Sequence, residues 1–187
     1  MNPAVLLTDL SQRSRVGCKG PGAESWLAGH AINVPPAANS YAVDSSGVLC
    51  ARLATSEFLL EAVEERDDCA VQPVKRALMY ADYPKGVYPV LRNDCVIELS
   101  GSALPQLFAQ TCAVDLTECA QHSTASAGPV ILTSMIGVSV VLTCRQAPAP
   151  RFTVWSDPSY GHYFWTQLLA IATDLGGGAS PASPIRT

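Results

Sequence analysis

The chain has 187 residues, a net charge of −4 at pH 7 and 15% charged residues, fewer than the roughly one quarter that is usual in soluble domains. Its length suffices to bury about 70% of the unfolded surface, so folding requires neither a metal nor a disulfide. The twelve Lys and Arg form no basic cluster, so no nucleic-acid partner is expected. The low charge predicts either a well-filled core or apolar surface that contacts a partner.

Seven cysteines, an odd number without CxxC spacing, argue against a disulfide framework and for a reducing compartment. Cys112 and Cys119 are close enough in sequence to consider a shared metal, but His30, His122 and His162 lie at no ligand-like spacing, and we expect no metal site. The first residues lack the basic and apolar regions of a signal peptide. The longest apolar stretch is too short to span a bilayer, so no membrane contact and a cytoplasmic location are expected.

We expect residues 1–14 to form a loose N-terminal lead-in and residues 15–178 to form a single α+β domain of two half-repeats, 15–84 and 89–178. Periodicity in the first half predicts a strand, a helix, a hairpin and a further strand over residues 14–20, 23–31, 41–54 and 57–63. Residues 64–80 are predicted to form a helix that is preceded or interrupted at Pro73.

The second half is predicted to repeat this plan with antiparallel strands and two helices. The strands are expected over residues 93–101, 130–135, 137–144 and 151–157, and the helices over 103–113 and 159–177, with a polar loop at 114–128. Gly176 is a candidate cap for the last helix. Residues 179–187 lack apolar periodicity and are expected to be a disordered tail.

The two halves contain a weak internal echo. Residues 20–34 and 100–114 align without a gap at an offset of 80, which places Ala23 on Ala103 and Leu27 on Leu107. In both copies a strand-like run enters a glycine-containing turn before an amphipathic segment. A repeat of this length indicates two copies of one supersecondary unit rather than a solenoid.

Candidate chemistry is sparse, and we identify no catalytic, cofactor-binding or metal-binding residues. Gly20 to Gly22 and Gly176 to Gly178 lack the spacing of phosphate-binding loops, and turn and cap roles explain them. A Cys112–His162 pair would be needed for a thiol-dependent hydrolase, but neither residue lies in a recognisable catalytic context. The aromatic residues of 152–165 are expected to be core, or else the first candidate for a docking surface.

Residues 17–27 read GCKGPGAESWL, which fits the pattern G-x-x-G-P-x-A-x-x-W/F-L, and residues 53–60 read LATSEFLL, which fits L-x-x-x-E-F/W-L-L. These motifs and their order resemble those of the glycine-cleavage T-protein-like superfamily, in which the first is an opening pattern and the second a strand. The second half, from LSGSALPQLFAQTCAVDL to VWSDPSYGHYFWTQLL, resembles the γ subunits of bacterial heterotetrameric sarcosine oxidases. The resemblance spans about residues 13–175, and N-methylglutamate dehydrogenases have a comparable subunit.

This resemblance implies an accessory, non-catalytic subunit of a flavin-dependent complex that oxidises sarcosine or a related N-methyl amino acid. FAD, FMN, NAD and tetrahydrofolate are then expected on larger flavoprotein partner subunits and not on this chain. The chain is about half as long as the folate-processing enzymes, and nothing near its N-terminus matches their acidic catalytic position. The alternative is a stand-alone folate-binding one-carbon-transfer protein of the T-protein type.

Overall fold

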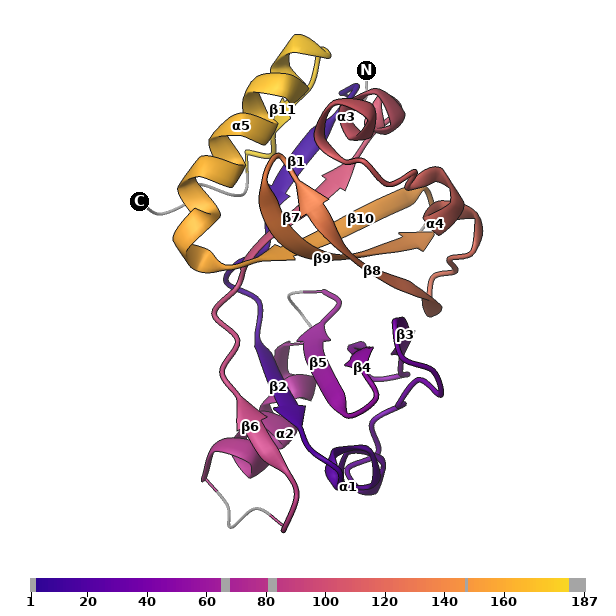
Figure 1. The fold of residues 1–187 in the computed structure, drawn as a ribbon, viewed down its shortest axis with the longest axis vertical. Helices are drawn as coiled ribbons and strands as arrows, with labels where there is room; N and C mark the ends of the chain where they lie inside the picture. The colour runs from indigo at the N-terminus through magenta and orange to yellow at the C-terminus, as the bar shows by residue number, and fades with distance from the viewer. Residues whose placement is uncertain (1–2, 65–67, 81–83, 147, 182–187) are drawn as a thin grey trace. The chain divides into compact units, whose positions relative to one another are not determined.

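The computed structural model describes residues 3–64, 68–80, 84–146 and 148–181. The chain divides into two compact units (Figure 1). Unit 1 comprises Met1–Gln12, Asn93–Ala125 and Ile131–Thr187, and unit 2 comprises Arg13–Arg92 and Ser126–Val130. The division after Arg92 therefore replaces the expected boundary between 84 and 89, and the N-terminal residues belong with the second half of the chain.

Unit 1 is built on a mostly antiparallel sheet. Its strands are β1 (Leu6–Asp9), β7 (Cys95–Ser100), β8 (Ala127–Met135), β9 (Val138–Gln146), β10 (Pro150–Ser156) and β11 (Gly178–Ala179). They are arranged in the order β11-β1-β7-β10-β9-β8. β1 pairs in parallel with β11 and antiparallel with β7, and β10 pairs antiparallel with both β7 and β9.

Helices cover one face of the unit 1 sheet and enclose its core. They are α3 (Leu104–Thr111), α4 (Thr117–Gln121) and α5 (Gly161–Asp174), the last preceded by a 3-10 turn, η2 (Pro158–Tyr160). In Figure 1, α5 runs beside β1 and β11, in agreement with its contacts. The strand period of two sends Phe152 and Val154 of β10 into this core, where Phe152 meets Phe108 of α3 edge to face at 4.7 Å.

Unit 2 contains a second antiparallel sheet. Its strands are β2 (Arg15–Lys19), β3 (Ser40–Val43), β4 (Val48–Ala54), β5 (Glu57–Ala62) and β6 (Tyr88–Val90). They follow the order β3-β4-β5-β2-β6, and the first residues of β8 pair with β3 within this unit. Asp44 closes the β3–β4 hairpin, because its carboxylate accepts hydrogen bonds from the backbone N–H groups of Ser46 and Val48.

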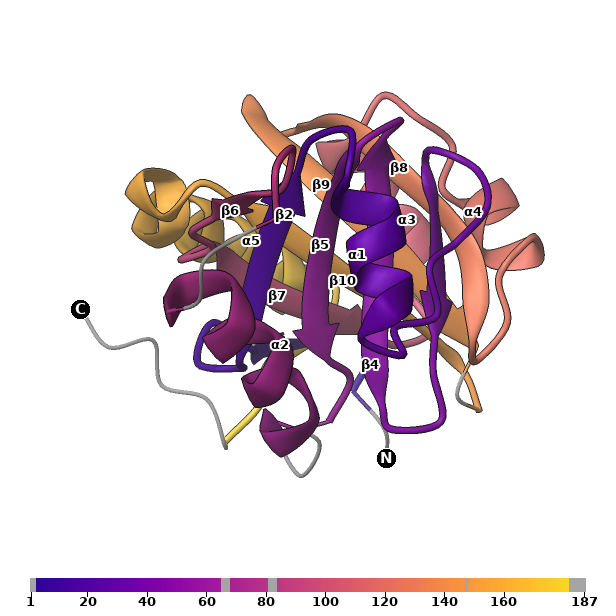
Figure 2. The ribbon, with the colours of Figure 1, turned by 90° about the horizontal axis from the view of Figure 1, so that it is seen from below.

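Two helices cover the unit 2 sheet, α1 (Ala23–Gly29) and α2 (Asp68–Tyr80). Figure 2 shows both on the same side of β2, β5 and β4. Ala23 and Leu27 of α1 point into the core, with Phe58 and Leu60 of β5 facing them from the sheet. α2 continues through Pro73, which lies within the first two turns of that helix.

Most predicted elements are confirmed, but α2 runs through Pro73 without the predicted interruption, and three further predictions are wrong. Residues 1–14 are not a loose lead-in, because β1 pairs with β7 and buries Val5 and Leu7 completely. The predicted polar loop at 114–128 contains α4. The tail prediction for 179–187 fails at its start, where Ala179 lies in β11; residues 182–187 lie outside the described part of the chain.

Each unit contains a strand, a glycine turn and a helix, but the spacing between the two copies differs from the sequence alignment. The turn glycines, Gly20 at φ +118° and Gly101 at φ +126°, are 81 residues apart, as are the first residues of α1 and α3. The same offset places Leu27 on Phe108, and both side chains are buried. The ungapped offset of 80 is therefore one residue short at the turn and helix. That the two units contain copies of one supersecondary unit stays a prediction.

Candidate functional site

The two glycine-rich points serve as turns that allow close backbone approach. A Cβ at Gly20 would lie closer than 3.0 Å to the carbonyl oxygen of Gly86, and the N–H of Gly22 donates to that same oxygen at 3.0 Å. At the other point, Gly176 follows the C-cap of α5 with φ +80°, and a Cβ at Gly177 would overlap the Val5 carbonyl. The predicted turn and cap roles are confirmed.

Five of the cysteines whose side chains the structure describes are buried: Cys18, Cys50, Cys95, Cys119 and Cys144. Burial raises the pKa of the Cys18, Cys50 and Cys144 thiols to about 12 and raises that of Cys119 as well. Since the thiolate is the nucleophile and the metal ligand, these four thiols are poorly suited to either role. The side chain of Cys69 lies outside the described residues.

The structure does not join Cys112 to His162. Cys112 is half-buried at the end of α3, where its Sγ lies 3.9 Å from Thr133 Oγ1, and His162 is exposed in the first turn of α5. Within the described ranges, no hydrogen bond links the two residues. Cys112 and Cys119 do not form part of a metal-binding group either, since no three His, Cys, Asp or Glu side chains in the described part of the chain are placed to hold an ion.

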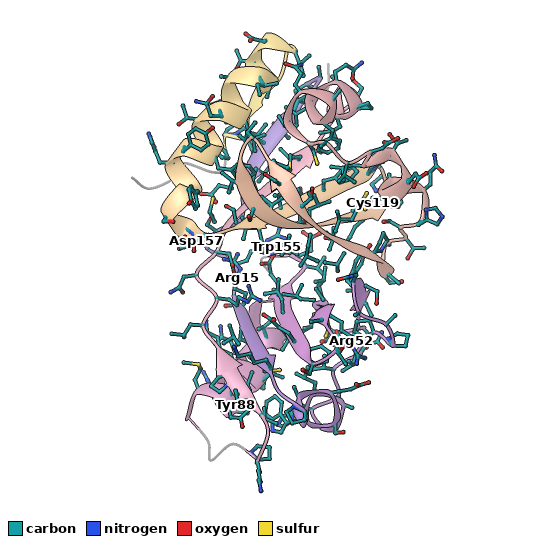
Figure 3. All side chains as sticks on the ribbon, in the orientation of Figure 1. Arg15, Arg52, Tyr88, Cys119, Trp155 and Asp157 are labelled. Carbon is teal, nitrogen blue, oxygen red and sulfur yellow. The ribbon has the colours of Figure 1, made fainter. Side chains whose placement is uncertain are left out.

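The aromatic residues of 152–165 are divided between core and surface. Phe152, Trp155 and Phe164 are almost completely buried, whereas Tyr160 and Tyr163 are about half exposed. Trp155 is marked on β10 in Figure 3. These residues therefore do not form a continuous docking surface, because β10 buries Phe152 and Trp155, α5 buries Phe164, and of the six aromatic residues only Tyr160 and Tyr163 are exposed.

Unit 2 contains a buried ion pair that the sequence did not reveal. Arg15 Nε donates to Glu61 Oε2 at 2.7 Å, and the two side chains are only 2% and 4% exposed. They are direct cross-strand partners on β2 and β5, and Figure 3 marks Arg15 on β2. Removal of either partner of such a pair lowers the free energy of unfolding, because it leaves a buried charge without its counter-charge.

A second arginine ties three segments of unit 2 together. Arg52 of β4 forms a forked pair with Glu24 of α1, with Nη1 to Oε1 at 3.2 Å and Nη2 to Oε2 at 2.8 Å. Its guanidinium also donates to the carbonyl oxygens of Pro35, Pro36 and Thr55. The planar donor fork satisfies several acceptors at once, so this arginine acts as a structural clamp.

A concave surface lies in unit 1 between α3 and α4. Two neighbouring cavities of about 340 and 260 Å³ share four lining residues, Pro105, Phe108, Leu116 and Thr117. We call their combined surface the α3–α4 groove. The larger cavity is also lined by Gly101, Ser102, Leu104, Ala120, Pro150 and Phe152, and the smaller by Ala109, Cys112, Ala113, Val114 and Asp115.

Residues 101–120, which form most of the α3–α4 groove, carry acidic side chains and no Lys or Arg. Asp115 lines the smaller cavity, and Glu118 is exposed in the first turn of α4. Hydrogen bonds from the Thr117 backbone and side chain lower the pKa of the exposed Asp115 carboxyl. Residues 93–144 contain no Lys or Arg at all. This gap in the distribution of basic residues is a sequence signal for an acidic surface.

No protein-family model matches the chain, and no curated protein matches it. Within the described residues, no helix has the length and apolarity needed to cross a bilayer.

Comparison with solved structures finds two informative similarities. The first is a chain of the heterotetrameric sarcosine oxidase from Corynebacterium sp. U-96, in complex with pyrrole 2-carboxylate, at a TM-score of 0.70 and 21% identity, covering 95% of this chain and 88% of that one. The second is the glycine cleavage system aminomethyltransferase T from Bartonella henselae, at a TM-score of 0.56 and 15% identity. It covers 89% of this chain but only 46% of the aminomethyltransferase. The chain therefore has a T-protein-like α+β fold.

Proposed function

We propose that the chain is a non-catalytic, γ-type subunit of a flavin-dependent complex that oxidises sarcosine or a related N-methyl amino acid. The observation that carries this proposal is the similarity to a chain of a heterotetrameric sarcosine oxidase over nearly the full length of both chains. The family resemblance of the sequence motifs supports the same assignment. The expected role is assembly, with apolar surface of this chain in contact with a larger subunit.

The cofactors of the complex belong, in this proposal, to the partners. FAD, FMN, NAD and tetrahydrofolate would be held by larger flavoprotein subunits, and this chain would hold none. The burial of Cys18, Cys50, Cys119 and Cys144 and the separation of Cys112 from His162 are consistent with a chain that lacks an active site of its own.

Co-purification tests the proposal. The chain would be expressed with a C-terminal tag in its native cells, and the recovered material would be examined for larger chains and for the absorption spectrum of flavin. We expect a yellow complex in fixed stoichiometry. Recovery of a colourless chain without partners would contradict the subunit assignment.

The alternative is a stand-alone folate-binding one-carbon-transfer protein, which the similarity to an aminomethyltransferase favours. This chain spans less than half of that enzyme. The α3–α4 groove is lined mainly by apolar side chains, which offer a pterin ring few hydrogen-bonding partners. Titration of the isolated chain with a reduced folate separates the two functions: saturable heat release would favour the alternative, and its absence would favour the subunit.

A further inference from the structure

We propose that the α3–α4 groove binds an amphipathic, positively charged α-helix supplied by a partner protein. This inference concerns the recognition chemistry of one surface and does not depend on the partner being a flavoprotein. It rests on the shape of the groove, the apolar residues exposed along it and the sign of the charge at its rim.

The groove presents apolar surface that the chain itself leaves uncovered. Its floor contains the buried side chains of Phe108 and Leu116, while Pro105 and Ala109 of α3 are exposed on its edge. Val114, at the same surface, is 41% exposed. Contiguous exposed apolar surface of this kind marks interaction sites on soluble proteins.

Two neighbouring cavities suit the spacing of side chains on a helix. A helix presents apolar residues on one face at i and i+3 or i+4, about 5.4 Å apart along its axis, and such residues anchor amphipathic helices in grooves. The cavities of about 340 and 260 Å³ adjoin each other, since Pro105, Phe108, Leu116 and Thr117 line both, so adjacent anchors would occupy one cavity each.

Charge complementarity determines the character of the polar face. Asp115 and Glu118 are exposed beside the groove, and the hydrogen bonds from Thr117 favour the ionised form of Asp115. Residues 93–144 contain no Lys or Arg, and Arg151 of β10, which lies between the lining residues Pro150 and Phe152, is paired with Glu98. Lys or Arg flanking the apolar anchors of a partner helix would be attracted to this rim, and acidic residues would be repelled.

Among the helices that the structure describes, none offers the required face in a second copy of this chain. α2 carries Lys75 and Arg76, but its apolar residues Val71, Val74 and Leu78 are buried in the core of unit 2. The occupant is therefore assigned to another protein.

Fluorescence anisotropy with the full chain and a labelled synthetic peptide tests this inference. The probe is a helix-forming peptide of about 14 residues, or four turns, with Leu at i, i+3, i+7 and i+10 and Lys on the opposite face. Two control peptides keep the length: one has a scrambled order without an apolar face, and the other has Glu in place of Lys.

Paired variants identify the groove as the binding surface. Ala109→Arg places a large cation on an exposed helical position inside the groove, and Ala170→Arg makes the same change on the exposed surface of α5, away from it. We expect Ala109→Arg to weaken binding of the Lys peptide about tenfold or more and Ala170→Arg to change it less than about twofold. Asp115→Asn with Glu118→Gln should weaken binding several-fold and reduce its salt dependence.

Three outcomes would overturn the inference. Binding of the scrambled peptide as tight as that of the Lys peptide would exclude an amphipathic helix as the ligand. Equal affinity of the Ala109→Arg and Ala170→Arg proteins would place any binding elsewhere. Equal affinity for the Lys and Glu peptides would refute the role of the acidic rim. None of these outcomes would affect recovery of a yellow complex in the co-purification. Failure of the peptide-binding inference is therefore distinguishable from failure of the proposed subunit function.

Discussion

The buried ion pair of unit 2 makes a quantitative prediction about stability. Arg15 and Glu61 lie directly opposite each other on β2 and β5, 2.7 Å apart, with exposed side-chain fractions of 2% and 4%. Replacing Glu61 by Leu would leave the guanidinium buried without its carboxylate. Removal of one partner of such a pair costs about 3–5 kcal/mol of the free energy of unfolding. At about 2–4 °C per kcal/mol for a chain of this size, the melting temperature should fall by roughly 6–20 °C.

The double variant isolates the interaction from the effect of each substitution alone. Arg15→Met combined with Glu61→Leu removes both charges and retains apolar volume, and such replacements are commonly neutral or even stabilising. We therefore expect the double variant to be more stable than either single variant, with a coupling energy of about 2 kcal/mol or more.

Urea unfolding followed by far-UV circular dichroism provides the free energies for this cycle. Because the pair is shielded from solvent, the coupling should change little between low and high salt. Single variants that each lose less than about 1 kcal/mol would refute the reasoning, since that is the range of exposed ion pairs. Additive losses in the double variant would refute it as well.

Three further predictions concern the turns, the thiols and the surface. Gly101→Ala should destabilise the chain by about 1–3 kcal/mol in the same urea titration, because φ is +126° and a Cβ would overlap the Ala4 carbonyl. The control is Gly29→Ala, which should be neutral or slightly stabilising because a Cβ there meets open space. Burial raises the pKa of Cys50 from 9.0 to about 12, so the thiol ionises in the unfolded chain at a lower pH than in the folded chain, and the free energy of unfolding should fall as the pH rises from 9 towards 12. Urea unfolding of Cys50→Ala should show a smaller fall over this range, and a fall equal to that of the wild-type chain would refute the role of Cys50. The isolated chain should self-associate through exposed apolar residues such as Leu91, which is 71% exposed; Leu91→Glu should reduce this in sedimentation velocity, and a wild-type chain that stays monomeric at high concentration would contradict it.

Most helices and strands were predicted correctly because the residues that determine them lie close together in the sequence. The strand run at 15–19, the glycine turn after it and the apolar positions of α1 all lie within one short segment, and the structure confirms them. The same holds for α5, where apolar residues recur at helical spacing until Gly176. These elements carry enough periodicity for their type to be assigned without knowledge of their neighbours.

The elements that the sequence prediction missed depend on distant partners. β1 has four residues, and its strand conformation comes from pairing with β7, about ninety residues later in the chain. β11 has two residues and forms only against β1. α4 is a single short turn of helix whose start is fixed by a hydrogen bond from the Thr117 N–H to Asp115. Periodicity cannot identify segments this short.

The candidate site could not be predicted because it depends on tertiary structure. The residues that line the α3–α4 groove lie within 101–120, except for Pro150 and Phe152 of β10, but only the packed fold shows that they enclose a cavity. Arg15 and Glu61 occupy strand positions that alternation alone would place in solvent, and only the folded sheet shows that they are buried together. The absence of Lys and Arg from residues 93–144 was the one signal available from the sequence.

Reduction of a flavin by substrate tests the central claim most directly. The chain would be recovered through its tag from native cells and mixed anaerobically with sarcosine, and then with other N-methyl amino acids, while the flavin absorption is recorded. The subunit assignment predicts a yellow complex whose flavin is bleached by one of these substrates. A colourless chain, or a flavin complex that no N-methyl amino acid reduces, would contradict it.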